Sequence, residues 1–179
     1  MRFLPAAAHR PQPWKNGLGV SRVIADDPVG AGFDALGWQV SATEIAADCP
    51  FSALPGLDRL FVVIGGAGVE LSSLDERGER KVAVVRPGEA PHAFRGDWVT
   101  QCRLLAGPVR VLNVIARRGA FEAALRCEAS GRVDAALGEI VVAIDPASLD
   151  AWIIDAGQVA PTAVGREPWV ARIRAKAGA

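Results

Sequence analysis

The first dense group of polar residues is the segment 14–19, which reads Trp-Lys-Asn-Gly-Leu-Gly. Lys15 offers a charged donor, and Asn16 offers both a donor and an acceptor. The glycines permit a tight turn that brings backbone close to a ligand. Trp14 is suited to wall a pocket, and Arg22 follows three residues after the turn. The segment therefore contacts a small molecule or is a structural turn around a partly buried Trp.

A second group of polar residues lies in the segment 41–59. If its start is a strand, Glu44 lies on the opposite face from Thr43. A carboxylate, a hydroxyl and the guanidinium of Arg59 in one loop-bounded region suit recognition of a small polar anion. The structural alternative is a salt bridge from Arg59 to Glu44 or Asp58 that only orients loops.

A third group follows in Phe-Arg-Gly-Asp (94–97) and in the segment 102–113. Its notable member is Asn113, which interrupts the strongly apolar run Val-Arg-Val-Leu-Asn-Val-Ile. A buried amide needs hydrogen-bond partners. Asn113 therefore either stabilises a loop or faces a cavity, and the sequence leaves both open.

Residue types that bind metals are few. The two histidines are far apart, His9 in a Pro-rich segment and His92 after Pro91 in a predicted turn. A transition-metal site needs several such ligands to converge. We therefore expect no metal and no cofactor. The three cysteines are widely spaced and form no CxxC pair, which favours free, buried thiols; they are Cys49, Cys102 and Cys127.

Motifs for other chemistries are missing from the sequence. It contains no Gly-x-Ser-x-Gly elbow, no Walker loop and no dinucleotide fingerprint. The run Gly-Gly-Ala-Gly (65–68) lacks a following Lys-Ser/Thr and a helix, so we interpret it as a hairpin turn between two strands.

The elements that must position these residues are short strands separated by Gly and Pro. Such segments recur about every 10 to 15 residues, which is typical of a β-sandwich or barrel. The segment 120–126 has a helix-favouring composition but is short and flanked by strands, so we predict a strand there. The strands predicted from apolar, β-branched runs are 60–64, 69–74, 81–85, 101–105, 109–115, 139–144 and 151–154.

The chain has 179 residues, which suits one compact domain or two small barrels that share a core. Lys plus Arg and Asp plus Glu number 20 each, so net charge gives no reason to expect nucleic acid or a membrane as partner. Prolines break any signal-like run at the N-terminus, so the cytoplasm is the expected compartment. The sequence before Arg117 contains long polar loops, and the sequence after it is richer in Ala. We therefore predict a first barrel over 1–116 and a smaller half over 117–179.

Taken in order, four stretches resemble the HutD/Ves family: PWKNGLGVSRVI, WQVSATEIAADCPFSALPGLDRLFVVIGGAGVEL, HAFRGD and CRLLAGPVRVLNVIARRG. They cover residues 13–119, close to two thirds of the chain. The resemblance implies an all-β, cupin-type (jelly-roll) double barrel. It also implies a ligand-binding modulator of histidine utilisation that responds to metabolites such as urocanate or N-formylglutamate.

The family's pocket maps onto eight residues of this sequence, and two nearby positions differ. Leu18 stands where the family commonly has Gly, and His92 stands where an aromatic residue is often found. The resemblance implies a ligand-binding set of Trp14, Lys15, Asn16, Arg22, Glu44, Phe51, Ser52 and Arg59.

Three classes of function remain open at this level. The first is a regulatory protein in which Lys15, Arg22 or Arg59 pairs with the carboxylate of a small organic acid, while Asn16 and Ser52 bind its other polar end. The second is a metal-independent isomerase or hydrolase of a small carboxylic acid. There Glu44 would be the general base.

The third class is a purely structural or protein-binding barrel. The sequence leaves monomer and homodimer both open.

Overall fold

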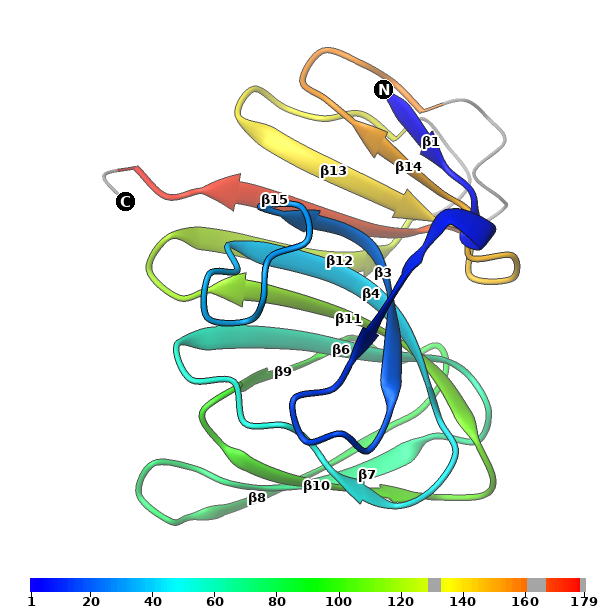
Figure 1. The fold of residues 1–179 in the computed structure, drawn as a ribbon. Helices are drawn as coiled ribbons and strands as arrows, with labels where there is room; N and C mark the ends of the chain where they lie inside the picture. The colour runs from blue at the N-terminus through cyan, green and yellow to red at the C-terminus, as the bar shows by residue number, and fades with distance from the viewer. Residues whose placement is uncertain (129–132, 161–166, 178–179) are drawn as a thin grey trace.

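The computed structural model describes residues 1–128, 133–160 and 167–177. Their regular structure consists of β-strands and one short 3-10 helix (Ala6–Ala8), arranged as three stacked sheets (Figure 1). The predicted all-β fold is confirmed. No helix in the described part of the chain is long and apolar enough to cross a bilayer.

The middle layer is a six-stranded antiparallel sheet, and it separates the other two layers (Figure 1). Its strands, in spatial order, are β2 (Arg10–Pro13), β3 (Val20–Asp27), β4 (Trp38–Ile45), β11 (Val109–Arg117), β6 (Leu57–Gly65) and β9 (His92–Arg95).

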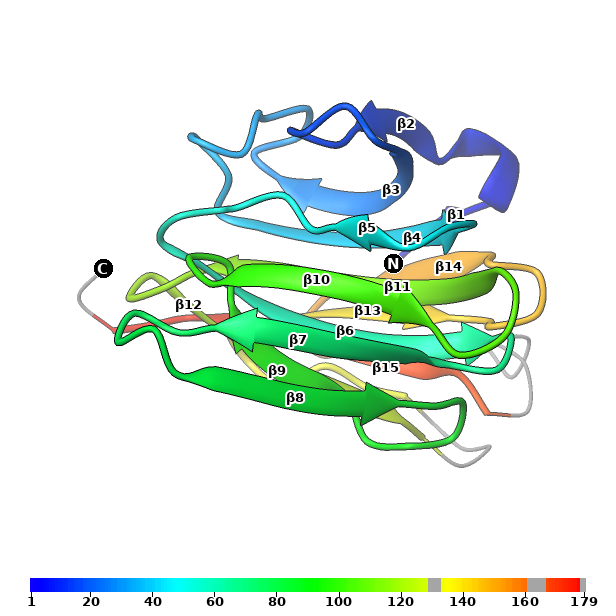
Figure 2. The same cartoon turned by 90° about the horizontal axis from the view of Figure 1, so that it is seen from below.

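The two outer layers are smaller antiparallel sheets. Figure 2 shows the four-stranded sheet nearest the viewer. Its order is β5 (Cys49–Pro50), β10 (Val99–Leu104), β7 (Val69–Leu74) and β8 (Arg80–Val85). The five-stranded sheet has the order β1 (Arg2–Leu4), β14 (Ala151–Ile154), β13 (Glu139–Ile144), β15 (Trp169–Ala175) and β12 (Phe121–Cys127).

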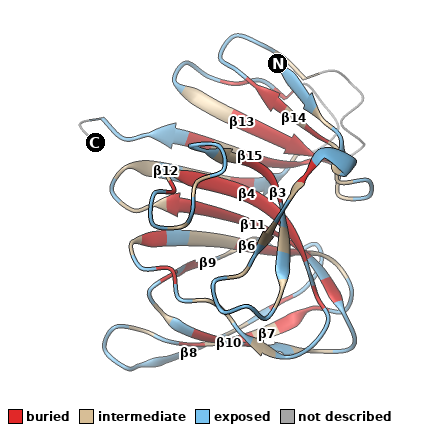
Figure 3. Cartoon of the chain, in the orientation of Figure 1, coloured by how far each residue is buried: buried red, intermediate tan, exposed pale blue. Residues whose placement is uncertain are grey.

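The central strands of the middle sheet are buried on both faces (Figure 3). On one face, side chains such as Val40 and Leu112 pack with Ile144 and Ile173 of the five-stranded sheet. On the other face, a second core forms with the four-stranded sheet around Phe61. Alternate residues of one strand therefore belong to different cores, because successive side chains of a strand point in opposite directions.

Every predicted strand is found, and the segment 120–126 lies almost entirely in β12 rather than a helix. The interpretation of residues 65–68 as a hairpin turn is wrong. β6 pairs with β11 and β9, whereas β7 pairs with β10 and β8, so this turn carries the chain from one sheet to the other. A Cβ on Gly66 would lie 2.5 Å from the carbonyl oxygen of Pro108, so this corner requires glycine for close packing.

The chain passes between the two halves of the fold more than once. β11 ends at Arg117, next to the predicted boundary, and the strands that follow it build the five-stranded sheet. β1, however, pairs with β14, with Phe3 opposite Trp152. The N-terminal strand thus joins the sheet formed by the C-terminal residues before the chain enters the first barrel.

Candidate functional site

A cavity of about 50 Å³ lies between the six-stranded and four-stranded sheets. Since one water occupies roughly 10 to 15 Å³ by this measure, the cavity admits a polar group of a few non-hydrogen atoms. Partly exposed residues, among them Trp14 and Ser52, mark its mouth. The lining consists of Trp14, Ser21, Phe33, Gln39, Ser41, Thr43, Ile45, Phe51, Ser52, Leu54, Arg59, Phe61, Val111, Asn113 and Ile115.

Arg59 is the only charged residue in this lining. It projects from β6, and its guanidinium carbon lies 4.9 Å from the ring centre of Phe51 and 5.0 Å from that of Phe94. Its Nε has no hydrogen-bond partner, and no carboxylate pairs with it among the described residues. Burial lowers the pKa of Arg59 to about 10, which still leaves the side chain cationic at neutral pH.

The neighbouring acid does not neutralise this charge. Asp58 is adjacent in sequence and therefore points to the other face of β6. There its carboxylate accepts a hydrogen bond of 2.8 Å from Nε of Arg118. The salt bridge from Arg59 to Asp58 or Glu44, considered as a structural alternative, is not formed.

Most other polar groups in the cavity already bind one another. Trp14 donates from Nε1 to Ser21 Oγ at 3.0 Å, and that hydroxyl lies 2.7 Å from Thr43 Oγ1. Gln39 donates from Nε2 to Gln12 Oε1 at 2.7 Å. These contacts hold the wall beside the mouth in one arrangement.

Four of the eight residues expected to bind a ligand line the cavity. They are Trp14, Phe51, Ser52 and Arg59.

Lys15 and Asn16 lie outside the cavity, in the exposed turn before β3. Nζ of Lys15 is 3.8 Å from a carboxylate oxygen of Asp34. The Asn16 amide donates to the carbonyl of Pro50 at 2.9 Å, and its backbone N–H donates to Ser52 Oγ at 3.2 Å. The turn is therefore tied to the segment that carries Phe51.

Arg22 and Glu44 lie on the opposite face of the middle sheet from the cavity. They line a separate groove that also contains Arg110 and Leu149. Glu44 therefore shares no cavity with Arg59.

The lining also contains polar residues that were absent from the expected set, chiefly Gln39, Ser41 and Asn113. The alternation of polar with apolar residues along β4 (Trp-Gln-Val-Ser-Ala-Thr) is the signal that could have identified the first two. For Asn113, the structure decides between the two alternatives: the residue faces the cavity.

Leu18 and His92, the two positions that differ from the family's common pattern, both lie outside the cavity lining. Leu18 is exposed in the turn. The ring of His92 stacks on Phe94 with the ring centres 5.5 Å apart. Burial lowers the pKa of His92. Neither His9 nor His92 lines the cavity, and the described residues contain no group of three potential metal ligands.

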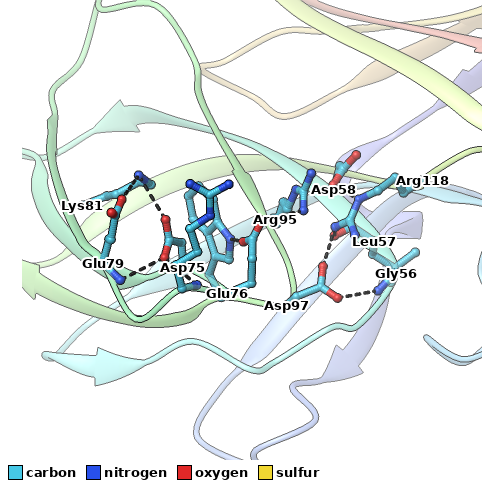
Figure 4. Close-up of polar contacts among 12 residues, drawn as sticks. Gly56, Leu57, Asp58, Asp75, Glu76, Glu79, Lys81, Arg95, Asp97 and Arg118 are labelled. Carbon is cyan, nitrogen blue, oxygen red and sulfur yellow. Dashed lines mark hydrogen bonds and ion pairs between the residues drawn. The ribbon is translucent and has the colours of Figure 1, made fainter.

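One end of the barrel is held by ion pairs that lie side by side in Figure 4. Arg118, directly after β11, binds the carboxylates of both Asp58 and Asp97. Asp97 in turn accepts the backbone N–H of Gly56 at 3.2 Å. These contacts connect the 54–57 loop, which contributes Leu54 to the cavity, with the turn after β9.

We expect the Arg118–Asp97 pair to make the free energy of unfolding depend on pH in the acidic range. The hydrogen bond from Arg118 lowers the pKa of Asp97 below its ordinary 3.8, so the pair stabilises the fold above that pH and loses this effect as Asp97 is protonated. Asp97→Asn should lower the free energy of unfolding by about 1 kcal/mol or less near neutral pH, because both side chains are partly exposed. The difference should shrink below about pH 4.

Urea unfolding of the wild type and Asp97→Asn between about pH 7 and pH 3 measures this difference. The control is Asp34→Asn, whose carboxylate is 99% exposed and should contribute nothing measurable. A difference between wild type and Asp97→Asn that stays constant with pH would contradict the assignment.

Comparison with known proteins agrees with this geometry. The HutD family model matches residues 6–152. A Pseudomonas putida relative described as an uncharacterized 21.2 kDa protein in the hutC 3' region is 34% identical over 115 residues. That alignment covers 64% of this chain and 57% of the relative, so the matched part spans little more than half of the relative's length.

Solved structures show the same fold. HutD from Pseudomonas fluorescens SBW25 is 27% identical with a TM-score of 0.76, and a conserved protein of unknown function from Pseudomonas aeruginosa PAO1 is 24% identical with a TM-score of 0.78. Both matches cover 98% of each chain. Oxalate decarboxylase of Bacillus subtilis matches 97% of this chain and 77% of its own at 8% identity with a TM-score of 0.59, which is a likeness of fold alone.

The expected resemblance is thus confirmed over most of the sequence and over the full fold. This chain has a cupin-type fold and belongs to the HutD family.

Proposed function

We propose that this protein binds a small organic acid in the first-barrel cavity and thereby modulates histidine utilisation. The observation that carries the proposal is Arg59, a cation in the cavity wall without a protein counter-ion among the described residues. A carboxylate would supply the missing partner through charge-assisted hydrogen bonds, which are the strong ones. The names of two relatives, HutD and a protein of the hutC 3' region, support the link to histidine utilisation.

The chemistry of the lining favours binding over catalysis. Among the residues that line the cavity there is no carboxylate, imidazole or thiol. General acid–base catalysis needs a group that exchanges a proton near the working pH, and an Arg with a pKa of about 10 does not do so. Glu44, the general base of the enzymatic alternative, lies on the other face of the sheet. The cavity can hold and orient an acid, but it offers no proton acceptor at neutral pH.

The aromatic side chains at Arg59 support the same use. Phe51 and Phe94 exclude water from the guanidinium, and a charge pair is stronger where water is excluded. Most of the remaining lining is apolar, as in small-molecule sites generally. The carboxylate would occupy the cavity, and the rest of a larger acid such as urocanate or N-formylglutamate would extend toward Trp14 and Ser52 at the mouth.

Thermal unfolding with increasing urocanate, N-formylglutamate, histidine or glutamate tests the proposal. At least one of these acids should raise Tm in a concentration-dependent way, because a ligand at about 100 times its Kd stabilises the folded state by about 2.7 kcal/mol. Imidazole and formamide, which lack the carboxylate, are the controls and should leave Tm unchanged. No response to any of the four acids at millimolar concentration would overturn the ligand class.

A further inference from the structure

Asn113, like Arg59, lines the cavity and has a polar side-chain atom without a hydrogen-bond partner among the described residues. It lies on β11 with 7% of its surface exposed, and its Oδ1 has no hydrogen-bond partner among the described residues. Its strand is otherwise apolar wherever it faces a core. Buried polar atoms in folded proteins almost always have a partner, so an unpartnered acceptor in a cavity wall points to a donor supplied by a ligand.

The β-sheet register places Asn113 beside Arg59. Asn113 is paired with Phe61, and Ile115 is paired with Arg59 on the neighbouring strand. Asn113 and Arg59 are therefore diagonal neighbours on the same face, with Cβ atoms roughly 7 to 8 Å apart. Both line the same small cavity, so one ligand of a few atoms can touch both.

The two polar side chains that the sequence suggested would bind the second end of a ligand are already engaged. Asn16, the residue expected from the sequence to do so, uses its amide to bind Pro50 and the backbone N–H of Leu18. Ser52 Oγ accepts a hydrogen bond from the backbone of Asn16. Asn113 Oδ1 therefore has no partner among the described residues, whereas Asn16 and Ser52 Oγ already have partners.

We propose that Asn113 determines specificity by accepting a hydrogen bond from a hydroxyl or N–H that lies two or three bonds from the carboxylate held by Arg59. The ligand class is then a small hydroxy, amido or azole acid rather than a simple alkanoic acid. This inference rests on the proposed function, because it takes the carboxylate to lie at Arg59. It assigns to Asn113 the role that the sequence suggested for Asn16 and Ser52.

Isosteric pairs of acids give the sharpest test. Glycolate differs from propionate, and 3-hydroxypropionate from butyrate, only by a hydroxyl in place of a methyl group. We expect the wild type to bind at least one hydroxy acid about tenfold more tightly than its isostere, the selectivity that one neutral hydrogen bond in a dry site provides. NMR-detected or calorimetric titration measures the ratio. This comparison needs no variant.

The variant Asn113→Leu removes the acceptor at similar volume. It should bring the ratio of the two affinities to about one while leaving the affinity for propionate or butyrate unchanged. Its Tm without ligand should not fall, because Oδ1 already lacks a partner. Gln101→Leu is the matched control, because it replaces an amide by Leu at an exposed position outside the cavity lining, and it should keep the wild-type ratio.

The outcomes separate this inference from the proposed function. Equal affinity for both members of each pair in the wild type overturns the role of Asn113 but leaves acid binding at Arg59 intact. If only urocanate or N-formylglutamate binds, an unchanged affinity of Asn113→Leu for that acid overturns the role of Asn113, whereas a loss of about tenfold supports it. A lower Tm for Asn113→Leu with an unchanged ratio shows a purely structural amide and overturns the inference. No binding of any acid overturns both.

Discussion

Arg59→Met is expected to abolish acid binding while leaving the ligand-free protein as stable as the wild type or more stable. Truncating one partner of a buried, hydrogen-bonded charge pair costs roughly 2 to 5 kcal/mol of binding free energy. We therefore expect a loss of affinity of about 100-fold or more for any acid that raises the Tm of the wild type.

The expected stability of Arg59→Met follows from the lack of a counter-ion for Arg59 among the described residues. Burial lowers the pKa of Arg59 from its ordinary value to about 10, which corresponds to a cost on the order of 3 kcal/mol for keeping the guanidinium charged in the folded state. The two phenylalanine rings return roughly 1 to 2 kcal/mol by cation–π attraction. Met fills similar space without a charge, so the free energy of unfolding should be unchanged or higher by about 1 to 2 kcal/mol.

The dependence on pH follows from the direction of the pKa shift. A base whose pKa is lowered by folding binds fewer protons in the folded than in the unfolded state between the two pKa values. The contribution of Arg59 to stability therefore changes with pH only above about 10, where it becomes more favourable because the side chain loses its proton in the folded state. Below that pH the cost is constant, so the Arg59→Met effect should be the same at pH 6 and pH 8.

Urea unfolding measures the free energy of unfolding, and titration of the same protein preparations measures the affinity for the acid. The control is Arg103→Met, since Arg103 is an exposed arginine on β10 that pairs only with Glu70; its replacement should change stability by less than about 0.5 kcal/mol and leave binding intact. A destabilisation of Arg59→Met with normal binding would show that Arg59 supports the barrel rather than a ligand. In the cell, the same variant should fail to replace the wild type in growth on histidine.

The sequence allowed the strands and part of the site to be predicted because both depend on local patterns. Alternating β-branched runs between Gly and Pro identify strands whatever lies around them. Trp14, Phe51, Ser52 and Arg59, which the family's motifs suggest, line the cavity, and their contact with a ligand stays a prediction. Pairings between distant segments, such as β1 with β14, leave no local pattern and were not predicted.

The placement of Arg22 and Glu44 away from the cavity, which the sequence did not predict, has one physical cause. In a two-layer sandwich, the apolar face of a strand is the inner face and the polar face meets water. β4 lies between two cores, so seven of its eight residues are buried and neither face is marked by exposure to water. The relative placement of Thr43 and Glu44 on opposite faces follows from the strand period, but their absolute placement requires the third layer.

The largest effect on stability is expected for Gly96→Ala, in the Phe-Arg-Gly-Asp turn after β9. A Cβ at this position would lie 2.4 Å from the carbonyl oxygen of Leu54 and 2.8 Å from that of Leu57. These contacts are with backbone, which no side-chain rotation can relieve. The same two segments are hydrogen-bonded to each other, from Leu54 N–H to Gly96 O and from Gly96 N–H to Leu57 O, at 2.7 Å each.

Inserting a methyl group there must separate the 54–57 loop from the turn and weaken both hydrogen bonds. Overpacking of a rigid contact costs about 1 to 3 kcal/mol, and the loss of the two bonds adds about 1 kcal/mol each. We therefore expect Gly96→Ala to lower the free energy of unfolding by about 3 to 5 kcal/mol. Acid binding should also weaken, because Leu54 lines the cavity beside Arg59.

Gly32→Ala is the matched control, because a Cβ there meets no atom within 4 Å and its φ is not in the left-handed region. It should leave stability unchanged or raise it by about 0.5 kcal/mol through the unfolded chain. If both substitutions cost equally little in urea unfolding, the contact between the loop and the turn does not hold the cavity wall. A large loss for Gly96→Ala alone, accompanied by weaker acid binding, would instead show that this contact fixes the wall against which the ligand is held.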